Sequence, residues 1–193
     1  MMNTAVNEQL QLYGELNGVL PVLVAIVIAI IVVAAQAWRH TVRPQTAAQV
    51  AMILYVGVLV GITLFPVNLY SPSNVMSKLP FGLQGPYINV NLADVRNYTP
   101  VQVYGNVLLF MPLGFLAGLI SKKYAQFAPN LALIVGTTFM IEAAQFIMCY
   151  FYLGNRTTDV VDLVTNTLGG IAGFLVLKLV QWLIPHAVAR VQE

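Results

Sequence analysis

The stretch LPVLVAIVIAIIVVAAQA, residues 20–37, contains no charged side chain and one polar side chain, Gln36. A helix needs about 20 predominantly apolar residues to cross the hydrocarbon core of a bilayer, with a usable range of about 17 to 25. Trp38, Arg39 and His40 follow the stretch and form an aromatic and basic end that suits the membrane–water interface. The stretch therefore predicts a membrane-spanning helix.

Four more apolar stretches of similar length follow along the chain. The complete set of expected spans is 20–37, 47–65, 103–120, 131–153 and 162–184. Buried helices of soluble proteins seldom reach this length, and five in succession without an amphipathic partner are typical of a membrane protein. The sequence predicts an all-α integral membrane protein built as a five-span helical bundle.

The composition points to the same class. The 193 residues include 9 Lys or Arg and 7 Asp or Glu, a charged fraction of 8%, against roughly 25% in soluble domains. Hydrophobic residues make up 59% and the mean hydropathy is +0.78, which excludes disordered and disulfide-rich secreted proteins. A formal charge of +2 is too small for a nucleic-acid partner. We expect the bilayer as the surroundings and one membrane domain over residues 1–193.

Basic residues near the span ends predict the orientation, because Lys and Arg are retained on the cytoplasmic side. Five of them fall on one predicted face, at Arg39, Arg43, Lys122, Lys123 and Arg190. The other face has Lys78, Arg96 and Arg156. We therefore expect the N-terminus outside and the C-terminus inside. The Pro-rich connection 66–102 then becomes an external loop, in which the alternation of YINVNL, residues 87–92, predicts one short strand.

Polar side chains concentrate on one face of each of the last two spans. At about 100° per residue, one arc of the fourth span holds Thr138, Glu142, Gln145, Cys149 and Tyr152. A similar arc at the start of the fifth holds Asp159, Asp162, Asn166, Gly169 and Gly173. A tight turn at residues 154–155 would let these two faces meet.

An ionised, unpaired Glu142 near the middle of the membrane would cost about 2.5 kcal/mol or more, so we expect it to face the bundle interior or to be protonated. Arg156 is the expected neutralising partner. Two interpretations of the cluster are open. It is a polar clamp that fixes helix packing, or it is a binding site. The number of polar residues at one end of so small a bundle favours a site.

Three motifs carry a resemblance to a known family: NVLLFMPLGF from Asn106, IEAAQF from Ile141 and RTTDVVDLVTNTLGGIAG from Arg156. Together they resemble the VanZ-like family over roughly residues 88–177. The family is named after an accessory protein that lowers susceptibility to the glycopeptide teicoplanin, so the resemblance implies a multi-pass protein of the bacterial cell membrane.

The resemblance carries over residue by residue to a ligand-binding set. This set is Asn106, Glu142, Gln145, Arg156, Asp159, Asp162 and Asn166, with Gly169 matching the family pattern as well. One segment departs from that pattern: NLADVRN, residues 91–97, lacks the Pro-Phe pair that family members often carry before the third span.

Three functions are compatible with these residues. The first is binding of a lipid-linked cell-wall component or a lipoglycopeptide, with Arg156 gripping a phosphate or carboxylate. The second is a hydrolase or transferase for a phosphorylated or acylated lipid, with Glu142, Asp159 and Asp162 as catalytic candidates and the two aspartates sharing a magnesium ion. The third is a small ion or solute transporter that uses Glu142. The mixed charge of the cluster favours the binder, with the enzyme next.

Overall fold

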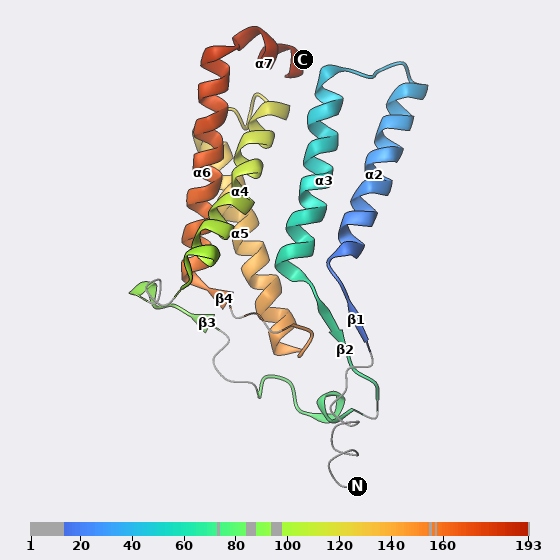
Figure 1. The fold of residues 1–193 in the computed structure, drawn as a ribbon, viewed down its shortest axis with the longest axis vertical. Coiled ribbons are helices and arrows are strands. Elements are labelled where there is room, and N and C mark those ends of the chain that lie inside the picture. The colour runs from blue at the N-terminus through green and yellow to red at the C-terminus, as the bar shows by residue number, and fades with distance from the viewer. Residues whose placement is uncertain are drawn as a thin grey trace.

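The computed structural model describes residues 14–72, 74–83, 88–93, 98–154, 156 and 158–192. Within these ranges, five helices are long and apolar enough to cross a membrane. They are α2 (Val19–Trp38), α3 (Pro44–Leu64), α4 (Pro100–Ile120), α5 (Phe127–Tyr150) and α6 (Val160–Leu183), and a short helix α7 (Pro185–Val191) follows. The predicted five-span bundle is confirmed (Figure 1).

Two helices begin one turn before the predicted span, each with proline at its first position. Proline is tolerated there because the first N–H groups of a helix have no intrahelical partner. At the start of α4, Thr99 Oγ1 accepts from Gln102 N at 3.3 Å and Gln102 Oε1 accepts from Thr99 N at 3.0 Å. This capping box places the helix start outside the apolar run from which the span was predicted.

Short strands gather at one end of the bundle (Figure 1). There β1 (Gly14–Leu16) pairs antiparallel with β2 (Val67–Leu69), and β3 (Ile88–Asn89) pairs parallel with β4 (Thr158–Asp159). A 3₁₀ helix, η1 (Val75–Lys78), lies in the same connection. β3 confirms the predicted short strand, although Tyr87 and residues 94–97 of the NLADVRN segment lie outside the described residues. We call the end of the bundle that carries these strands the strand-bearing end.

The closest helix pair is α4 with α6. A Cβ added at Gly173 would collide with the main chain of Met111, and one added at Gly169 with the main chain of Val107. Gly114 on α4 approaches the main chain of α6 in the same way. Because glycine has no side chain, the two backbones can touch at these positions. Small residues commonly allow such close contact between membrane helices.

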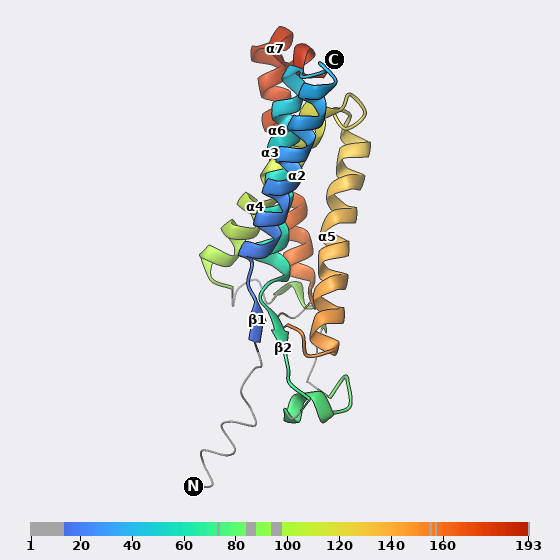
Figure 2. The ribbon, with the colours of Figure 1, turned by 90° about the vertical axis from the view of Figure 1, so that its right-hand side faces the viewer.

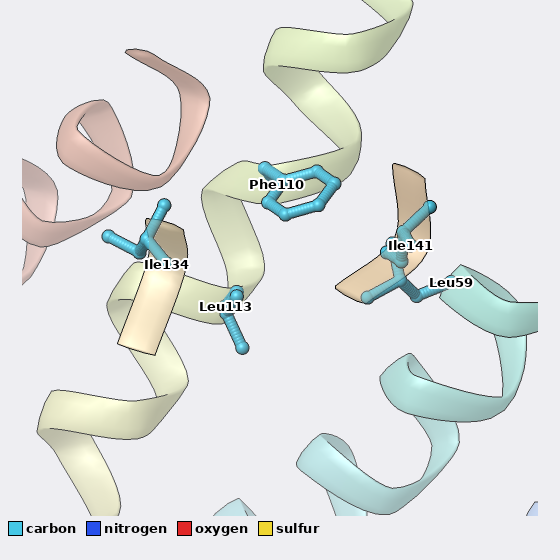
Figure 3. Close-up of a cluster of buried hydrophobic side chains, with 5 residues drawn as sticks. All are labelled: Leu59, Phe110, Leu113, Ile134 and Ile141. Atoms are coloured by element: carbon cyan, nitrogen blue, oxygen red, sulfur yellow. The ribbon is translucent and has the colours of Figure 1, made fainter. Parts of the chain in front are cut away.

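A hydrophobic cluster joins α3 to α4 and α5. Its buried members are Leu59, Phe110, Leu113, Ile134 and Ile141, from α3, α4 and α5 (Figure 3). By contrast, α2 packs mainly against α3 and is the outermost helix of the bundle in Figure 1. Figure 2 shows α5 along one side of the bundle.

The end of α5 is closed by an unusual residue. Tyr152 has a φ of 61°, and Leu153 N donates to Met148 O at 2.7 Å, as in a Schellman motif that normally uses glycine. The Tyr152 side chain is 2% exposed. Its hydroxyl donates to Pro80 O at 2.8 Å and accepts from Leu83 N at 3.2 Å. Contacts with the long connection therefore hold a tyrosine where glycine would be less strained.

Replacing Tyr152 with Phe should remove both hydrogen bonds while keeping the buried ring. We expect the free energy of unfolding to fall by about 1 to 2 kcal/mol, because Pro80 O and Leu83 N lose a partner. Detergent-solubilised protein titrated with SDS would report the change. Tyr150→Phe is the matched control, since within the described ranges the Tyr150 hydroxyl makes no hydrogen bond. Equal losses from both variants would contradict the expectation.

Candidate functional site

The polar face predicted for α5 is its interior face. Thr138 is 0% exposed, Glu142 4% and Gln145 6%, and Cys149 is buried as well. These side chains do not all meet one another. Glu142 and Thr138 face α6, whereas Gln145 faces α3.

Glu142 fastens the segment that precedes α6. Its Oε2 accepts from Asp159 N at 2.9 Å, and its main-chain oxygen accepts from Thr158 Oγ1 at 3.0 Å. Both donors belong to β4, so a single residue of α5 fixes the position of that strand. A buried acceptor with a charge-assisted bond of this kind is among the stronger polar contacts in proteins.

Asp159 caps α6 and anchors the long connection. Its Oδ1 accepts from Val161 N at 2.7 Å, as an N-cap carboxylate does. Its Oδ2 accepts from Asn89 Nδ2 at 3.0 Å and from the Tyr98 hydroxyl. A negative charge at a helix N-terminus is favourable, and here both carboxylate oxygens already accept hydrogen bonds.

The remaining predicted residues join helices. Asn106 Nδ2 on α4 donates to Asp162 Oδ1 at 2.7 Å on α6. Asn166 Nδ2 on α6 donates to Thr138 Oγ1 at 3.0 Å on α5. Interhelical hydrogen bonds of this type hold membrane helices together. This half of the predicted cluster therefore forms the packing clamp that the sequence left as the alternative interpretation.

The magnesium site considered from the sequence does not fit these residues. Asp159 directs both oxygens at protein donors, and Asp162 Oδ1 is bonded to Asn106. Within the described part of the chain, no group of three or more His, Cys, Asp or Glu side chains is placed to hold a metal ion.

Arg156 lies on the other side of α5. It is exposed and, among the residues that the structure describes, it makes no hydrogen bond or ion pair. The expected pairing of Arg156 with Glu142 is therefore wrong, because Glu142 bonds to the β4 main chain instead. Arg156 instead lines a cavity with Gln145 and Met148, and its charge interacts with Asp162 near the start of α6.

Arg156 lines a cavity of about 160 Å³ at the strand-bearing end, which we call the Arg156 cavity and which has both apolar and polar walls. Its walls come from the end of α3, β2, α5 and the segment before β4: Thr63, Leu64, Phe65, Pro66, Asn68, Gln145, Met148, Gly154 and Arg156. Gln145 Nε2 donates to Thr63 O at 2.9 Å. Gln145 Oε1 is buried and has no hydrogen-bond partner within the described residues, as is also the case for Asn130 Oδ1 and Asn166 Oδ1, and of the three residues only Gln145 lines this cavity.

A second depression, of about 490 Å³, lies on the opposite side of α5 between β3 and α6. Its walls are mostly apolar, including Phe139, Phe146 and Leu163, with Glu142 and Asp159 at its base. Because those two carboxylates already serve as acceptors for the protein itself, the polar group left open to a ligand is Arg156.

The sequence did not indicate several residues that the structure places at the site. Thr63 and Asn68 line the Arg156 cavity, and Asn89 and Tyr98 bind Asp159. Thr63 and Asn68 lie outside the range of the resemblance, and Asn89 and Tyr98 lie inside it but before its first motif at Asn106. The alternation of apolar and polar residues at 87–92 predicted that Asn89 belongs to a strand. It did not indicate that Asn89 binds Asp159.

The geometry can now be set beside known proteins. A family model described as VanZ/LLP1 matches residues 52–181, from α3 through α6. The chain belongs to the VanZ-like family. The match includes the 88–177 range of the sequence resemblance, which is confirmed, and extends it to the helix that supplies Thr63.

A curated relative agrees with the family. The VanZ-like chain is 37% identical over 106 residues to Protein VanZ of Enterococcus faecium, covering 48% of this chain and 60% of that protein. The chain therefore spans less than two thirds of the length of this relative. No solved structure matches the fold. With its five apolar helices, the chain is a multi-pass bacterial membrane protein.

Proposed function

We propose that this VanZ-like protein binds the polar headgroup of a lipid-linked cell-wall component in the Arg156 cavity and thereby lowers susceptibility to teicoplanin. The proposal follows from membership of the VanZ-like family, which is named after a protein that lowers teicoplanin susceptibility, and from the similarity to Protein VanZ of Enterococcus faecium. The observation that supports it best is an exposed Arg156, without a partner in the described chain, beside a buried acceptor that also lacks one.

The two groups together define a ligand chemistry. The Arg156 guanidinium presents donors in a fork that suits phosphate or carboxylate. Gln145 Oε1 would accept from a hydroxyl or amide N–H next to that anion. A sugar phosphate has both features, as does an acidic peptide of a cell-wall precursor. A lipoglycopeptide with a free carboxylate is the alternative ligand of the same chemistry.

The expected orientation determines the side of the membrane on which the Arg156 cavity would lie. With the C-terminus inside, the strand-bearing end faces the outside of the cell, where cell-wall precursors and the antibiotic meet. The acidic cluster then has a positioning role: Glu142 holds β4, which begins two residues after Arg156. We prefer binding to catalysis because the carboxylates that an enzyme would use are committed to protein donors.

The test is the binding of a water-soluble sugar 1-phosphate to purified full-length protein in neutral detergent. Arg156→Ala should weaken binding at least about tenfold, because hydrogen bonds to charged groups contribute about 1.5 to 3 kcal/mol. Arg156→Lys should fall between, since it keeps the charge and loses the fork. The matched control is Arg39→Ala, an exposed arginine at the opposite end.

In cells, wild type and Arg156→Ala expressed at equal levels should differ in teicoplanin susceptibility, with the variant closer to cells that lack the protein. Arg39→Ala should match wild type. Unchanged binding and unchanged susceptibility in Arg156→Ala would overturn the proposal. Release of product from a polyprenyl phosphate or a lipid-linked disaccharide would replace it with the hydrolase or transferase hypothesis.

A further inference from the structure

A long apolar groove runs between α2 and α3, with a volume of about 510 Å³. Leu20, Val24 and Ile28 of α2 and Met52, Val56 and Val60 of α3 form its walls. Every residue that lines it is apolar or glycine. The groove therefore offers no polar contact and suits a hydrocarbon chain.

The groove and the Arg156 cavity are adjacent. Phe65, which follows the last residue of α3, lines both the groove and the cavity. Gln145 and Arg156 line the cavity with it, and apolar side chains of α2 and α3 line the groove with it. A ligand that crossed Phe65 would pass directly from polar to apolar surroundings, as an amphiphile does at a membrane surface.

The length of the groove suits one leaflet of a bilayer. Leu20 to Ile28 is eight helical steps, about 12 Å at 1.5 Å per residue. Half of a hydrocarbon core that is about 30 Å thick is about 15 Å. The groove thus extends from the strand-bearing end almost to the middle of the membrane, which is the depth of a lipid tail.

The contact between α2 and α3 forms the floor of the groove. A Cβ added at Gly57 would meet the Ala25 side chain and the Pro21 carbonyl, so α2 and α3 touch at this level. Val24 and Val56, by contrast, are 50% and 43% exposed. The groove is therefore a furrow between two helices already in contact, and filling it requires no helix movement.

We propose that the groove between α2 and α3 holds the hydrocarbon chain of the same ligand whose anionic headgroup lies at Arg156. This rests on the proposed function and adds the ligand class: a single-chain or polyprenyl phosphate amphiphile inserted in one leaflet, rather than a free anion. α2 then serves as one wall of the chain site, which accounts for a membrane helix that packs mainly against one neighbour.

Photo-labelling with dodecyl phosphate that carries a diazirine near the end of its chain tests this directly. In the full-length protein in phosphatidylcholine vesicles, adducts should concentrate on residues 20–28 and 52–60. The same chain with an alcohol headgroup should label all lipid-facing helices evenly. Excess inorganic phosphate should reduce groove labelling, because it competes for Arg156 alone.

Two variants of one helix sharpen the result. Val24→Trp should lower groove labelling about fivefold or more, because an indole fills the furrow. Val27→Trp should leave it unchanged, since Val27 is 56% exposed and does not line the groove. Neither change should alter sugar 1-phosphate binding.

The outcomes separate the two proposals. Even labelling of all helices, or equal effects of Val24→Trp and Val27→Trp, would overturn the chain site while Arg156-dependent binding of the sugar phosphate persists. Loss of any Arg156-dependent binding, by contrast, would overturn the proposed function and this inference with it.

Discussion

Glu142→Ala should lower the free energy of unfolding by about 2 kcal/mol and weaken ligand binding at Arg156, although it leaves Arg156 itself intact. The change deprives Asp159 N of its acceptor, and an unsatisfied buried N–H costs about 1 to 3 kcal/mol. It also removes one of the two hydrogen bonds that hold β4 on α5, since the bond from Thr158 Oγ1 to the Glu142 main chain remains, so the segment that carries Arg156 is held less firmly. SDS titration and sugar 1-phosphate binding measure the two effects.

Glu142→Gln provides the decisive control, because a glutamine Oε1 can accept from Asp159 N in the same geometry. We expect it to restore most of the stability and most of the binding. A proton or ion site at Glu142 would behave differently: Gln would then act like Ala, since it cannot release a proton. That result would revive the enzyme or transporter hypothesis and contradict the positioning role.

Gly173→Val should have the largest effect on stability, about 3 kcal/mol, at the upper end of what overpacking costs. The added side chain would occupy the place of the Met111 main chain, so α4 and α6 would have to separate. The matched control is Gly136→Val on α5, where an added Cβ meets nothing within 4 Å. Folding yield in detergent and SDS titration provide the comparison.

The separation of α4 and α6 would also strain Asn106 and Asp162, which bond across the same helix pair. Binding at Arg156 should survive in the fraction of Gly173→Val that folds, because the Arg156 cavity has no wall from α4 or α6. If Gly173→Val and Gly136→Val were equally stable, the close contact between the two backbones could not be what holds the bundle together.

The helices and their buried faces followed from the sequence because both depend on local information. A run of apolar residues sets the span, and a period of 3.6 residues sets which side chains share a face, so Thr138, Glu142 and Gln145 were correctly placed together. Periodicity does not indicate, however, which neighbouring helix each of these side chains faces. Glu142 meets α6 and Gln145 meets α3, although both lie on one arc.

The position of Arg156 could not be predicted for a different reason. It lies between α5 and β4, where the path of the chain depends on the closure at Tyr152 and on hydrogen bonds to Pro80 and Leu83 in the long connection. These contacts join residues about 70 positions apart in sequence. Opposite charge predicted Glu142 as the partner of Arg156. In the structure the Glu142 carboxylate instead accepts a hydrogen bond from Asp159 N of β4.

The anchoring of the long connection by Asp159 has a consequence for how the protein is made. Asn89 and Tyr98 bond to a residue some 60 to 70 positions later in the chain, and β3 pairs with the same segment. During synthesis from the N-terminus, the first three spans can enter the membrane before residue 159 leaves the ribosome. The connection must then wait, without its partner, until the last span arrives, so the strand-bearing end is the final part of the molecule to mature.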